Sequence, residues 1–267
     1  MNESTKPFAV VTGASSGIGY ELARQFAEHG YDLLICSEHS GIKDAEHALT
    51  EFNVLVESIQ ADLATYEGVE TLYRRIRQDG RPVAAIAINA GIGVSGDFSQ
   101  DTDLEDELKL IQLNIVSPVH LAKRVLKDMM REGGGRILFT SSIAGTMPTP
   151  FYAVYGASKA FLTSFAQAVR SELKDQPVTI TVLMPGATET EFFERAGMED
   201  TKLGVSEKDD PAQVAKEGFE ALMAGKDHVV AGSLKNKLQA AAGHVLPDTV
   251  VAGMHRKQSE PGSANKQ

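Results

Sequence analysis

The chain has 267 residues, of which 42% are hydrophobic and 23% charged, and its formal net charge at pH 7 is -10. These proportions are those of a globular protein whose length allows one sizeable core. The excess of acid argues against a nucleic-acid-binding surface, because neutralising phosphates requires clustered Lys and Arg. The single cysteine, Cys36, excludes an internal disulfide and fits a reducing compartment.

The beginning of the sequence, MNESTKPFAVV, has no basic region followed by a long apolar segment, as a signal peptide would have. The most apolar run, residues 82–94, is shorter than the ~18 residues that indicate a membrane span. We therefore expect a cytoplasmic protein that binds neither membranes nor nucleic acid. The sequence has no cysteine spacing typical of a metal site, and we expect no bound metal.

Short β-rich runs alternate with longer amphipathic stretches along the chain. Helices are expected at residues 18–30 and in a segment that ends near Phe52. Apolar residues on both faces of the runs, with helices between them, indicate a parallel sheet covered on both sides. The fold class is therefore α/β, with a doubly wound parallel sheet of the Rossmann type. The predicted strands are residues 8–12, 32–37, 54–60, 84–89, 135–141 and 178–184.

The composition changes after about residue 231, where two helical stretches, SLKNKLQAAAGHV and VVAGMHRKQ, follow one another. We expect a single domain over residues 1–267, with its core at about 7–230 and a C-terminal helical extension at about 231–267. The polar ending, SEPGSANKQ, is expected to be loose. The extension could cap the sheet, contact a partner subunit, or do both.

A glycine-rich loop, TGASSGIG, occupies residues 12–19, between the first predicted strand and the first predicted helix. In that position the backbone N–H groups of the first helical turn point toward the ends of the strands and favour an anion. The glycines let the backbone turn sharply and approach a pyrophosphate, and Ser15 and Ser16 can add hydroxyl donors. The loop predicts a nucleotide site, the alternative being a glycine-rich turn that holds no ligand.

The spacing of the loop, TGxxxGxG, resembles that of the short-chain dehydrogenase/reductase (SDR) family, which binds NAD or NADP. Further segments resemble the family's pattern in the same order, over residues 8 to about 195. The resemblance implies an NAD(P)-dependent oxidoreductase. The segments are AD before Leu63, NAG at 89–91, LNI around Asn114, SSIAG with Ser142, YGASK with Tyr155 and Lys159, and PGATET at 185–190.

The same resemblance implies which residues hold the cofactor. Asp62 would contact the adenine, Thr190 would meet the nicotinamide carboxamide, and the NAG segment would support the central sheet beside the cofactor. The cofactor-binding residues predicted in this way are Gly13, Ser15, Ser16, Gly17, Ile18, Gly19, Ser37, Glu38, Asp62, Leu63, Asn89, Ala90, Gly91, Tyr155, Lys159, Pro185, Gly186, Thr188 and Thr190.

Hydride transfer is the chemistry of the cofactor, so the protein has to position the substrate and manage one proton. The resemblance implies that Tyr155 carries this proton, donating it in reduction and removing it in oxidation. The ordinary pKa of tyrosine is about 10, and we expect the ammonium of Lys159, one helical turn along, to lower the pKa of Tyr155. Tyr152 is set aside because a glycine, not a lysine, stands four residues after it.

The remaining catalytic roles also follow from the resemblance. Ser142 would orient and polarise the substrate oxygen, and Lys159 would bond the nicotinamide ribose. Asn114 would hold a water that links Lys159 to solvent, the alternative being an ordinary capped or kinked helix position. Ser141 competes with Ser142, but the thirteen-residue spacing to Tyr155 favours Ser142.

The choice between NAD and NADP is usually made just after the second strand, where the sequence reads ICSEHS. Ser37 stands where NAD-dependent members of the family have an acidic residue, and Glu38 stands where NADP-dependent members often have Arg. Glu38 would repel a 2′-phosphate, and His39, mostly neutral at pH 7, is the only nearby candidate cation. We expect NAD to be preferred over NADP, unless Glu38 points into solvent.

The substrate is expected over the nicotinamide, between the segment TMPTPF at 146–151 and the segment after Thr190. An apolar lining from Met147, Phe151, Phe192 and Phe193 is plausible, and residues 93–98 could form a third wall. These features predict a secondary alcohol or a ketone with an apolar body.

Two other functions remain open at this point. A non-catalytic regulator or scaffold could keep the fold and the dinucleotide, although the intact set of Ser142, Tyr155 and Lys159 argues against it. An epimerase or dehydratase would use the cofactor transiently, but its usual loop, TGxxGxxG, is spaced differently. The resemblance also implies a homodimer or homotetramer, formed through helices at about 103–131 and 153–174.

Overall fold

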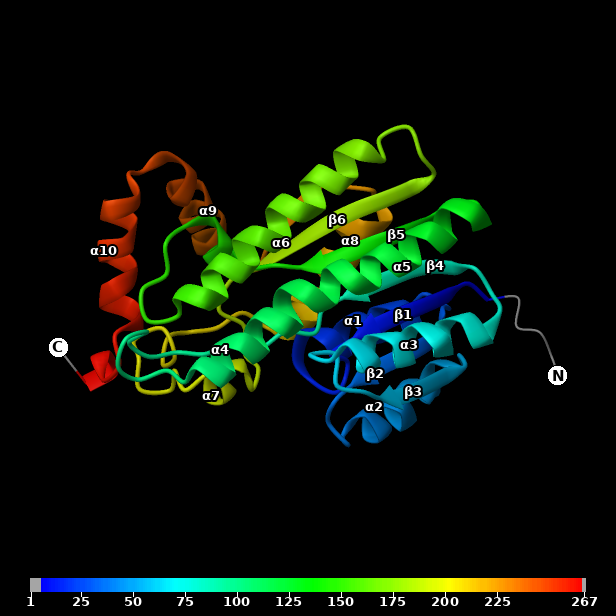
Figure 1. The fold of residues 1–267 in the computed structure, drawn as a ribbon, viewed down its shortest axis with the longest axis horizontal. Helices are drawn as coiled ribbons and strands as arrows, with labels where there is room; N and C mark the ends of the chain where they lie inside the picture. Colours follow the sequence, from blue (N-terminus) through cyan, green and yellow to red (C-terminus); the bar gives the residue numbers. More distant parts are fainter. Residues whose placement is uncertain (1–5, 266–267) are drawn as a thin grey trace.

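The computed structural model describes residues 6–265. Within that range seven parallel strands form one sheet in the order β3-β2-β1-β4-β5-β6-β7 (Figure 1). The predicted doubly wound α/β fold is confirmed, and β7 is the strand that the sequence pattern did not predict. The strands are β1 (Phe8–Thr12), β2 (Asp32–Ser37), β3 (Val56–Gln60), β4 (Val83–Ile88), β5 (Gly135–Thr140), β6 (Val178–Pro185) and β7 (His228–Ala231).

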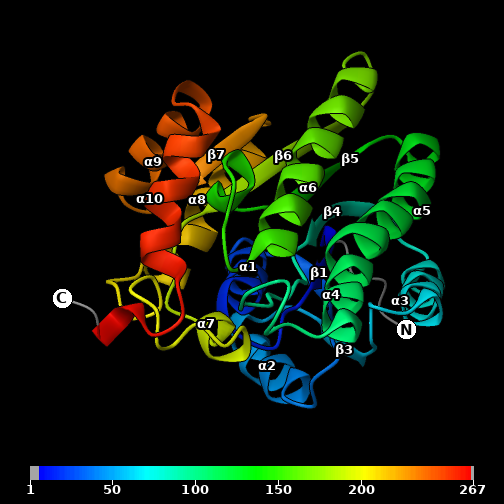
Figure 2. The same cartoon turned by 60° about the vertical axis from the view of Figure 1, so that its left-hand side comes forward.

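Helices cover both faces of the sheet and build two apolar cores (Figures 1 and 2). One core lies under α3, α5 and α6 and the other under α1, α2 and α8. No helix among the described residues is long and apolar enough to cross a membrane. The helices are α1 (Gly17–Glu28), α2 (Ile42–Leu49), α3 (Tyr66–Asp79), α4 (Leu104–Ile111), α5 (Ser117–Glu132), α6 (Ala153–Glu172), α7 (Phe192–Arg195), α8 (Pro211–Met223), α9 (Leu234–Val245) and α10 (Asp248–Ser259).

The expected helix at about 103–131 contains a π-helical turn, η2 (Gln112–Val116), between α4 and α5. Pro118 has no backbone N–H, so the carbonyl of Asn114 cannot receive the usual α-helical hydrogen bond from that position. The side chain of Asn114 is engaged elsewhere, with the backbone of Ile92. Such π-turns occur frequently at functional sites.

In the C-terminal extension α9 packs against β7, and α10 packs against α9 (Figure 2). The expectation that the polar ending is loose stays a prediction, and the described part of this ending contacts the segment after α7. The hydroxyl of Ser263 accepts a hydrogen bond from the backbone N–H of Lys202, and the N–H of Gly262 donates to Asp200. These contacts satisfy polar groups that a solvent-exposed tail would leave to water. Residues 266–267 lie outside the described part.

Candidate active site

The carboxyl ends of β1 and β4 meet where the order of strands reverses, which is the usual ligand crevice of a doubly wound sheet. The buried hydroxyl of Thr12 accepts hydrogen bonds from the backbone N–H groups of Asn89 and Ala90, at 2.9 and 3.1 Å. The carboxamide of Asn89 donates back to the carbonyl of Thr12. The NAG segment therefore fastens β4 to β1 at the floor of the crevice.

The glycine loop forms one wall of a cavity of about 860 Å³. A Cβ at Gly19 would lie 2.0 Å from the carbonyl oxygen of Gly13, so the turn from β1 into α1 tolerates only glycine at that position. Gly17 has a φ of +56°, in the left-handed region that favours glycine. Ser16, at the N-cap of α1, makes no capping hydrogen bond to the first turn. The helix thus presents an uncapped N-terminus to the cavity, as an anion site requires.

The end of β2 carries the residues expected to read the cofactor ribose. The hydroxyls of Ser37 and Ser15 lie 3.0 Å apart, and Lys109 Nζ lies 3.5 Å from a carboxylate oxygen of Glu38. Arg195 of α7 lies with one guanidinium nitrogen 3.1 Å from Nε2 of His39. The expectation that His39 is the only nearby cation candidate is wrong, because folding brings in cations from α4 and α7. Both are paired with carboxylates, Lys109 with Glu38 and Arg195 with Glu191.

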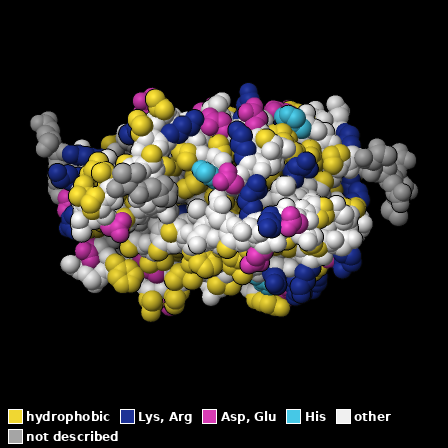
Figure 3. Space-filling model, turned by 90° about the horizontal axis from the view of Figure 1, so that it is seen from above, with side chains coloured by type: hydrophobic (Ala, Val, Ile, Leu, Met, Phe, Trp, Pro, Cys, Tyr) yellow, Lys and Arg dark blue, Asp and Glu magenta, His cyan; other side chains and the backbone are white. Residues whose placement is uncertain are grey.

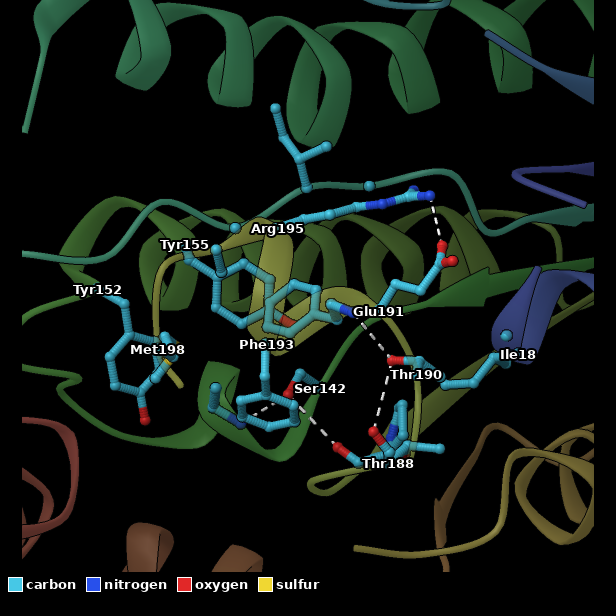
Figure 4. A pocket seen from close by; sticks show the side chains of 18 of the residues that line it. Ile18, Ser142, Tyr152, Tyr155, Thr188, Thr190, Glu191, Phe193, Arg195 and Met198 are labelled. Atoms are coloured by element: carbon cyan, nitrogen blue, oxygen red, sulfur yellow. Dashed lines mark hydrogen bonds and ion pairs between the residues drawn. The ribbon is translucent and has the colours of Figure 1, made fainter. Parts of the chain in front are cut away.

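Three predicted catalytic residues line the same cavity, Ser142 from the end of β5 and Tyr155 and Lys159 from α6. Figure 4 shows two of them, Ser142 and Tyr155. The ammonium of Lys159 lies 5.6 Å from the centre of the Tyr155 ring and donates to the carbonyl of Thr140 at 3.0 Å. Lys159 and Tyr155 share one face of α6 because they are four residues apart. Ser142 lies close enough to Tyr155 to favour its phenolate.

Burial dominates the ionisation of this group. Burial raises the pKa of Tyr155 to about 12, because its effect exceeds the lowering effect of the nearby Ser142 hydroxyl. The expectation that Lys159 brings the pKa of Tyr155 below its ordinary value is therefore wrong for the protein alone. Burial also lowers the pKa of Lys159 to about 8. Near neutral pH the pair consists of a protonated phenol beside an ammonium that is close to losing its proton.

Asn114 is buried on the π-turn η2, where the oxygen and the nitrogen of its side-chain amide both hydrogen-bond to the backbone of Ile92. Its Oδ1 accepts from the N–H of Ile92 at 3.0 Å, and its Nδ2 donates to the carbonyl of Ile92 at 2.9 Å. Nδ2 also lies 3.1 Å from the hydroxyl of Ser158, which in turn donates to the carbonyl of Tyr155. Asn114 therefore ties the segment after β4 to the helix that carries Tyr155.

The neighbouring serines Ser141 and Ser142 have different hydrogen-bond partners. The hydroxyl of Ser141 donates to the carbonyl of Lys159 at 2.8 Å and lies 2.7 Å from that of Thr163, so it is committed to α6. The hydroxyl of Ser142 accepts from the N–H of Ala144 and lies 3.3 Å from the carbonyl of Pro185. Ser142 is thus the serine whose hydroxyl is placed beside Tyr155, as its spacing suggests.

The remaining predicted cofactor residues also line the cavity. Asp62 caps its own turn, with Oδ1 accepting from the N–H of Ala64, and the hydroxyl of Thr188 donates to the carbonyl of Gly186. Thr190 accepts at its hydroxyl from the N–H of Phe192. The lining residues predicted from the sequence are Gly13, Ser15, Ser16, Gly17, Ile18, Gly19, Ser37, Glu38, Asp62, Leu63, Asn89, Ala90, Gly91, Pro185, Gly186, Thr188 and Thr190.

The apolar wall differs in part from the expected one. Phe192 and Phe193 line the cavity, and the Phe192 ring centre lies 5.1 Å from that of Tyr155. Met147 and Phe151 are not among the lining residues, and Phe151 instead lies under the guanidinium of Arg256. Other lining residues, missed from the sequence, are Tyr152, Met198, Gln239 and His255. No sequence motif marks Met198, Gln239 and His255, which come from the variable segment and from the C-terminal helices, whereas Tyr152, set aside in the sequence analysis, stands just before α6.

Residues 7–200 match the family model described as short chain dehydrogenase. The chain belongs to this family. This SDR enzyme is an NAD(P)-dependent oxidoreductase. It is 33% identical over 190 residues to sulfoacetaldehyde reductase 2 of Chromohalobacter salexigens, a match that covers 68% of this chain and 73% of that one.

Solved structures of dehydrogenases are similar to this chain as well. A short-chain dehydrogenase from Sphingobium yanoikuyae in complex with NADPH is 29% identical, with a TM-score of 0.78 over 89% of this chain and 92% of that chain. The bulky-bulky ketone specific alcohol dehydrogenase from Comamonas testosteroni is 26% identical, with a TM-score of 0.75 over the same shares.

Proposed function

We propose that this enzyme interconverts a ketone and a secondary alcohol, with Tyr155 as the acid and base. The observation that carries the proposal is that Ser142, Tyr155 and Lys159 meet in one cavity, which the glycine loop also lines. A proton donor, an orienting hydroxyl and a cation beside a dinucleotide site are the groups that carbonyl reduction requires.

The residues present fit a dinucleotide. The uncapped N-terminus of α1 suits a pyrophosphate, and the cavity extends from Glu38 at one end past Tyr155 to α10 at the other. Residues 13–19, 37–38, 62–63, 89–91 and 185–190 would hold the two nucleotides. When bound, the nicotinamide supplies or accepts the hydride.

The proton is the protein's part of the reaction. Because burial raises the pKa of Tyr155 to about 12, its phenol is protonated at neutral pH and ready to donate to a carbonyl oxygen. Ser142 would hold that oxygen in line, and Lys159 would bond the nicotinamide ribose. Asn114, fixed between Ile92 and Ser158, would hold the water that links Lys159 to solvent.

We propose NAD as the preferred cofactor. Glu38 lies at the ribose end of the cavity, with Lys109 3.5 Å from its carboxylate. A dianionic 2′-phosphate placed beside Glu38 would be repelled, whereas ribose hydroxyls could donate to it. Arg195 is the cation that could favour NADP instead. Its ion pair with Glu191 partly neutralises the charge that a 2′-phosphate would meet.

We further propose that the single domain assembles as a homodimer or homotetramer through the face formed by α4, α5 and α6. A groove of about 370 Å³ on that face is lined by Phe98, Ile111, Ile115, Ala153, Val154, Ala157 and Ser158. Exposed apolar side chains surround it, among them Leu108 at 50% and Phe161 at 41% exposure. Figure 3 shows hydrophobic side chains gathered along its lower edge, which is the side of these helices. Contiguous apolar surface of this kind is typical of a subunit interface.

The decisive experiment has two stages. Fluorescence titration with NADH and NADPH measures binding, and a panel of ketones then measures turnover by the wild type and by Tyr155→Phe. We expect tighter binding of NADH and turnover that the Phe variant loses while it still binds NADH. Binding of cofactor without turnover of any ketone would favour a regulator over an enzyme, and preferred binding of NADPH would overturn the assignment of Glu38.

A further inference from the structure

A chain of polar side chains lines the cavity and includes Tyr152, which lies on the side of Tyr155 away from Ile18 (Figure 4). It starts at Tyr152, whose hydroxyl lies 2.9 Å from Nδ1 of His255 on α10. Nε2 of His255 lies 2.9 Å from the side-chain nitrogen of Gln239 on α9. All three residues line the cavity, and both Tyr152 and His255 are 5% exposed. The hydride-transfer chemistry described above uses none of them.

The direction of these hydrogen bonds follows from the donor groups. The side-chain nitrogen of Gln239 can only donate, so Nε2 of His255 must accept. A neutral imidazole then carries its proton on Nδ1 and donates it to the oxygen of Tyr152. The O–H of Tyr152 is left to donate elsewhere, and it has no second hydrogen-bond partner among residues 6–265.

The surroundings keep this donor uncharged. Tyr152 packs against Ala144, Phe193 and Met198, and its ring centre lies 6.1 Å from that of Tyr155. Burial raises the pKa of Tyr152 and lowers the pKa of His255, so both side chains are neutral near pH 7. Tyr152 is thus a neutral O–H donor in an apolar wall. Its ring is next to that of the proton donor Tyr155.

We propose that Tyr152 is a specificity-determining residue that donates a hydrogen bond to a second oxygen of the substrate, with His255 and Gln239 as its positioning residues. The inference rests on the proposed ketone reductase function and narrows its substrate class. The preferred substrates are ketones, or the corresponding secondary alcohols, whose apolar body carries another carbonyl, ester or ether oxygen. A substrate without that oxygen would leave the buried O–H unpaired, which is unfavourable.

The test compares matched ketones that differ only in an acceptor. The probes are methyl esters of oxo acids with two to five carbons between ketone and ester, each paired with the 2-alkanone of equal chain length. We expect the wild type to prefer the ester by roughly tenfold in kcat/KM for the spacer that fits, the size of one well-placed hydrogen bond. Tyr152→Phe should bring that ratio close to one, mainly through a higher KM for the ester. An unchanged ratio across the series would overturn the inference.

Control variants distinguish a role in substrate recognition from a role in folding. Tyr31→Phe removes a phenolic hydroxyl that contacts the Met223 sulfur, away from the cavity, and should keep the ester preference. His255→Asn, whose amide nitrogen can stand in for Nδ1, should keep it as well. His255→Leu should lose most of it, and equal behaviour of the Asn and Leu variants would exclude a positioning role for His255. NADH binding and thermal melting report whether each variant is folded.

A second readout does not need turnover. Titration calorimetry of the same probes onto Tyr155→Phe saturated with NADH should show the same preference for the ester, lost again when Tyr152→Phe is added. Failure of the proposed reductase function would abolish turnover and leave this binding preference in place. Failure of the present inference would leave turnover in place and make the two members of each pair bind alike.

Discussion

The hydroxyl of Ser16 donates a hydrogen bond to a carboxylate oxygen of Glu191 across 3.3 Å, joining the glycine loop to the segment before α7. Glu191 is also paired with Arg195, which lies against His39 at the end of β2. A carboxylate therefore stands at the N-terminus of α1, where the pyrophosphate of a dinucleotide would lie.

The first prediction concerns that carboxylate. Glu191→Gln is expected to tighten NADH binding by roughly threefold, because it removes a negative charge that competes with the pyrophosphate at an exposed site. Fluorescence titration at low salt measures the effect, which should shrink as salt is added. Glu194→Gln, three residues away on α7, is the matched control, since Glu194 does not line the cavity. Weaker NADH binding by Glu191→Gln would show instead that Glu191 helps to position α7.

The second prediction separates the two serines. Ser142→Ala should lower kcat for ketone reduction by about 100-fold, because it removes the donor that polarises the substrate oxygen. Ser141→Ala should keep kcat within a few fold and instead lower the free energy of unfolding by about 1–2 kcal/mol, since its buried hydroxyl has two partners on α6. Urea unfolding and steady-state kinetics on both variants check the pair. The reverse pattern would exchange the roles of the two serines.

The third prediction is a pH profile. Ketone reduction should be nearly constant up to about pH 7, fall to about half near pH 8 and decline further above it, because Lys159, whose pKa burial lowers to about 8, loses its charge while Tyr155 stays protonated. The quantity to measure is kcat/KM, which reports the free enzyme. Lys159→Arg keeps its charge at high pH, so whatever activity it retains should not decline there. A decline of the wild type that begins only near pH 10 would assign it to a different group.

The fourth prediction follows from the same buried charge. Lys159 is charged in the folded and unfolded protein below about pH 8, so the cost of burying the charge is fully present there. Between about pH 8 and its ordinary pKa of 10.5 the folded protein releases the proton first, and the cost declines. Lys159→Met should therefore raise the free energy of unfolding at pH 7 by about 1–3 kcal/mol, with much less gain at pH 10. A gain equal at both pH values would indicate better packing rather than removal of a charge.

The fifth prediction tests the subunit interface. Phe161→Asp places a charge on the exposed apolar face of α6 and should shift the protein to monomers in sedimentation velocity at micromolar concentration. Val205→Asp, at a residue that is 62% exposed and lies outside that face, should leave the assembly unchanged. A wild type that sediments only as a monomer would contradict the proposed oligomer.

The features predictable from the sequence were those with a local cause. Buried strands have continuous apolar runs, and the turn from β1 to α1 needs glycines at fixed positions, so both could be read from short segments. The strand β7 was missed because His228–Ala231 is four residues long and only Ala231 is fully buried. The π-turn at Asn114 was not predicted, because Pro118 indicates only a missing backbone hydrogen bond and the contact of Asn114 with Ile92 is not visible in a helical period.

The parts of the site that could not be predicted depend on distant contacts. Arg195 and His39 are 156 positions apart, and Tyr152 and His255 are 103 apart, so no spacing rule connects them. The sequence shows that Lys159 is near Tyr155 but not that the phenol is buried, and burial decides the direction in which the pKa of Tyr155 shifts. The cytoplasmic location remains a prediction.

The placement of His255 on α10 has a consequence for how the site is completed during synthesis. A nascent chain that has left the ribosome up to Thr190 already contains the segments proposed to hold the dinucleotide. The wall beside Tyr152 is finished only when α9 and α10 have emerged and docked. The dinucleotide-binding part of the pocket thus forms before the substrate wall. Fusions or deletions after α8 would therefore alter the choice of substrate more readily than the choice of coenzyme.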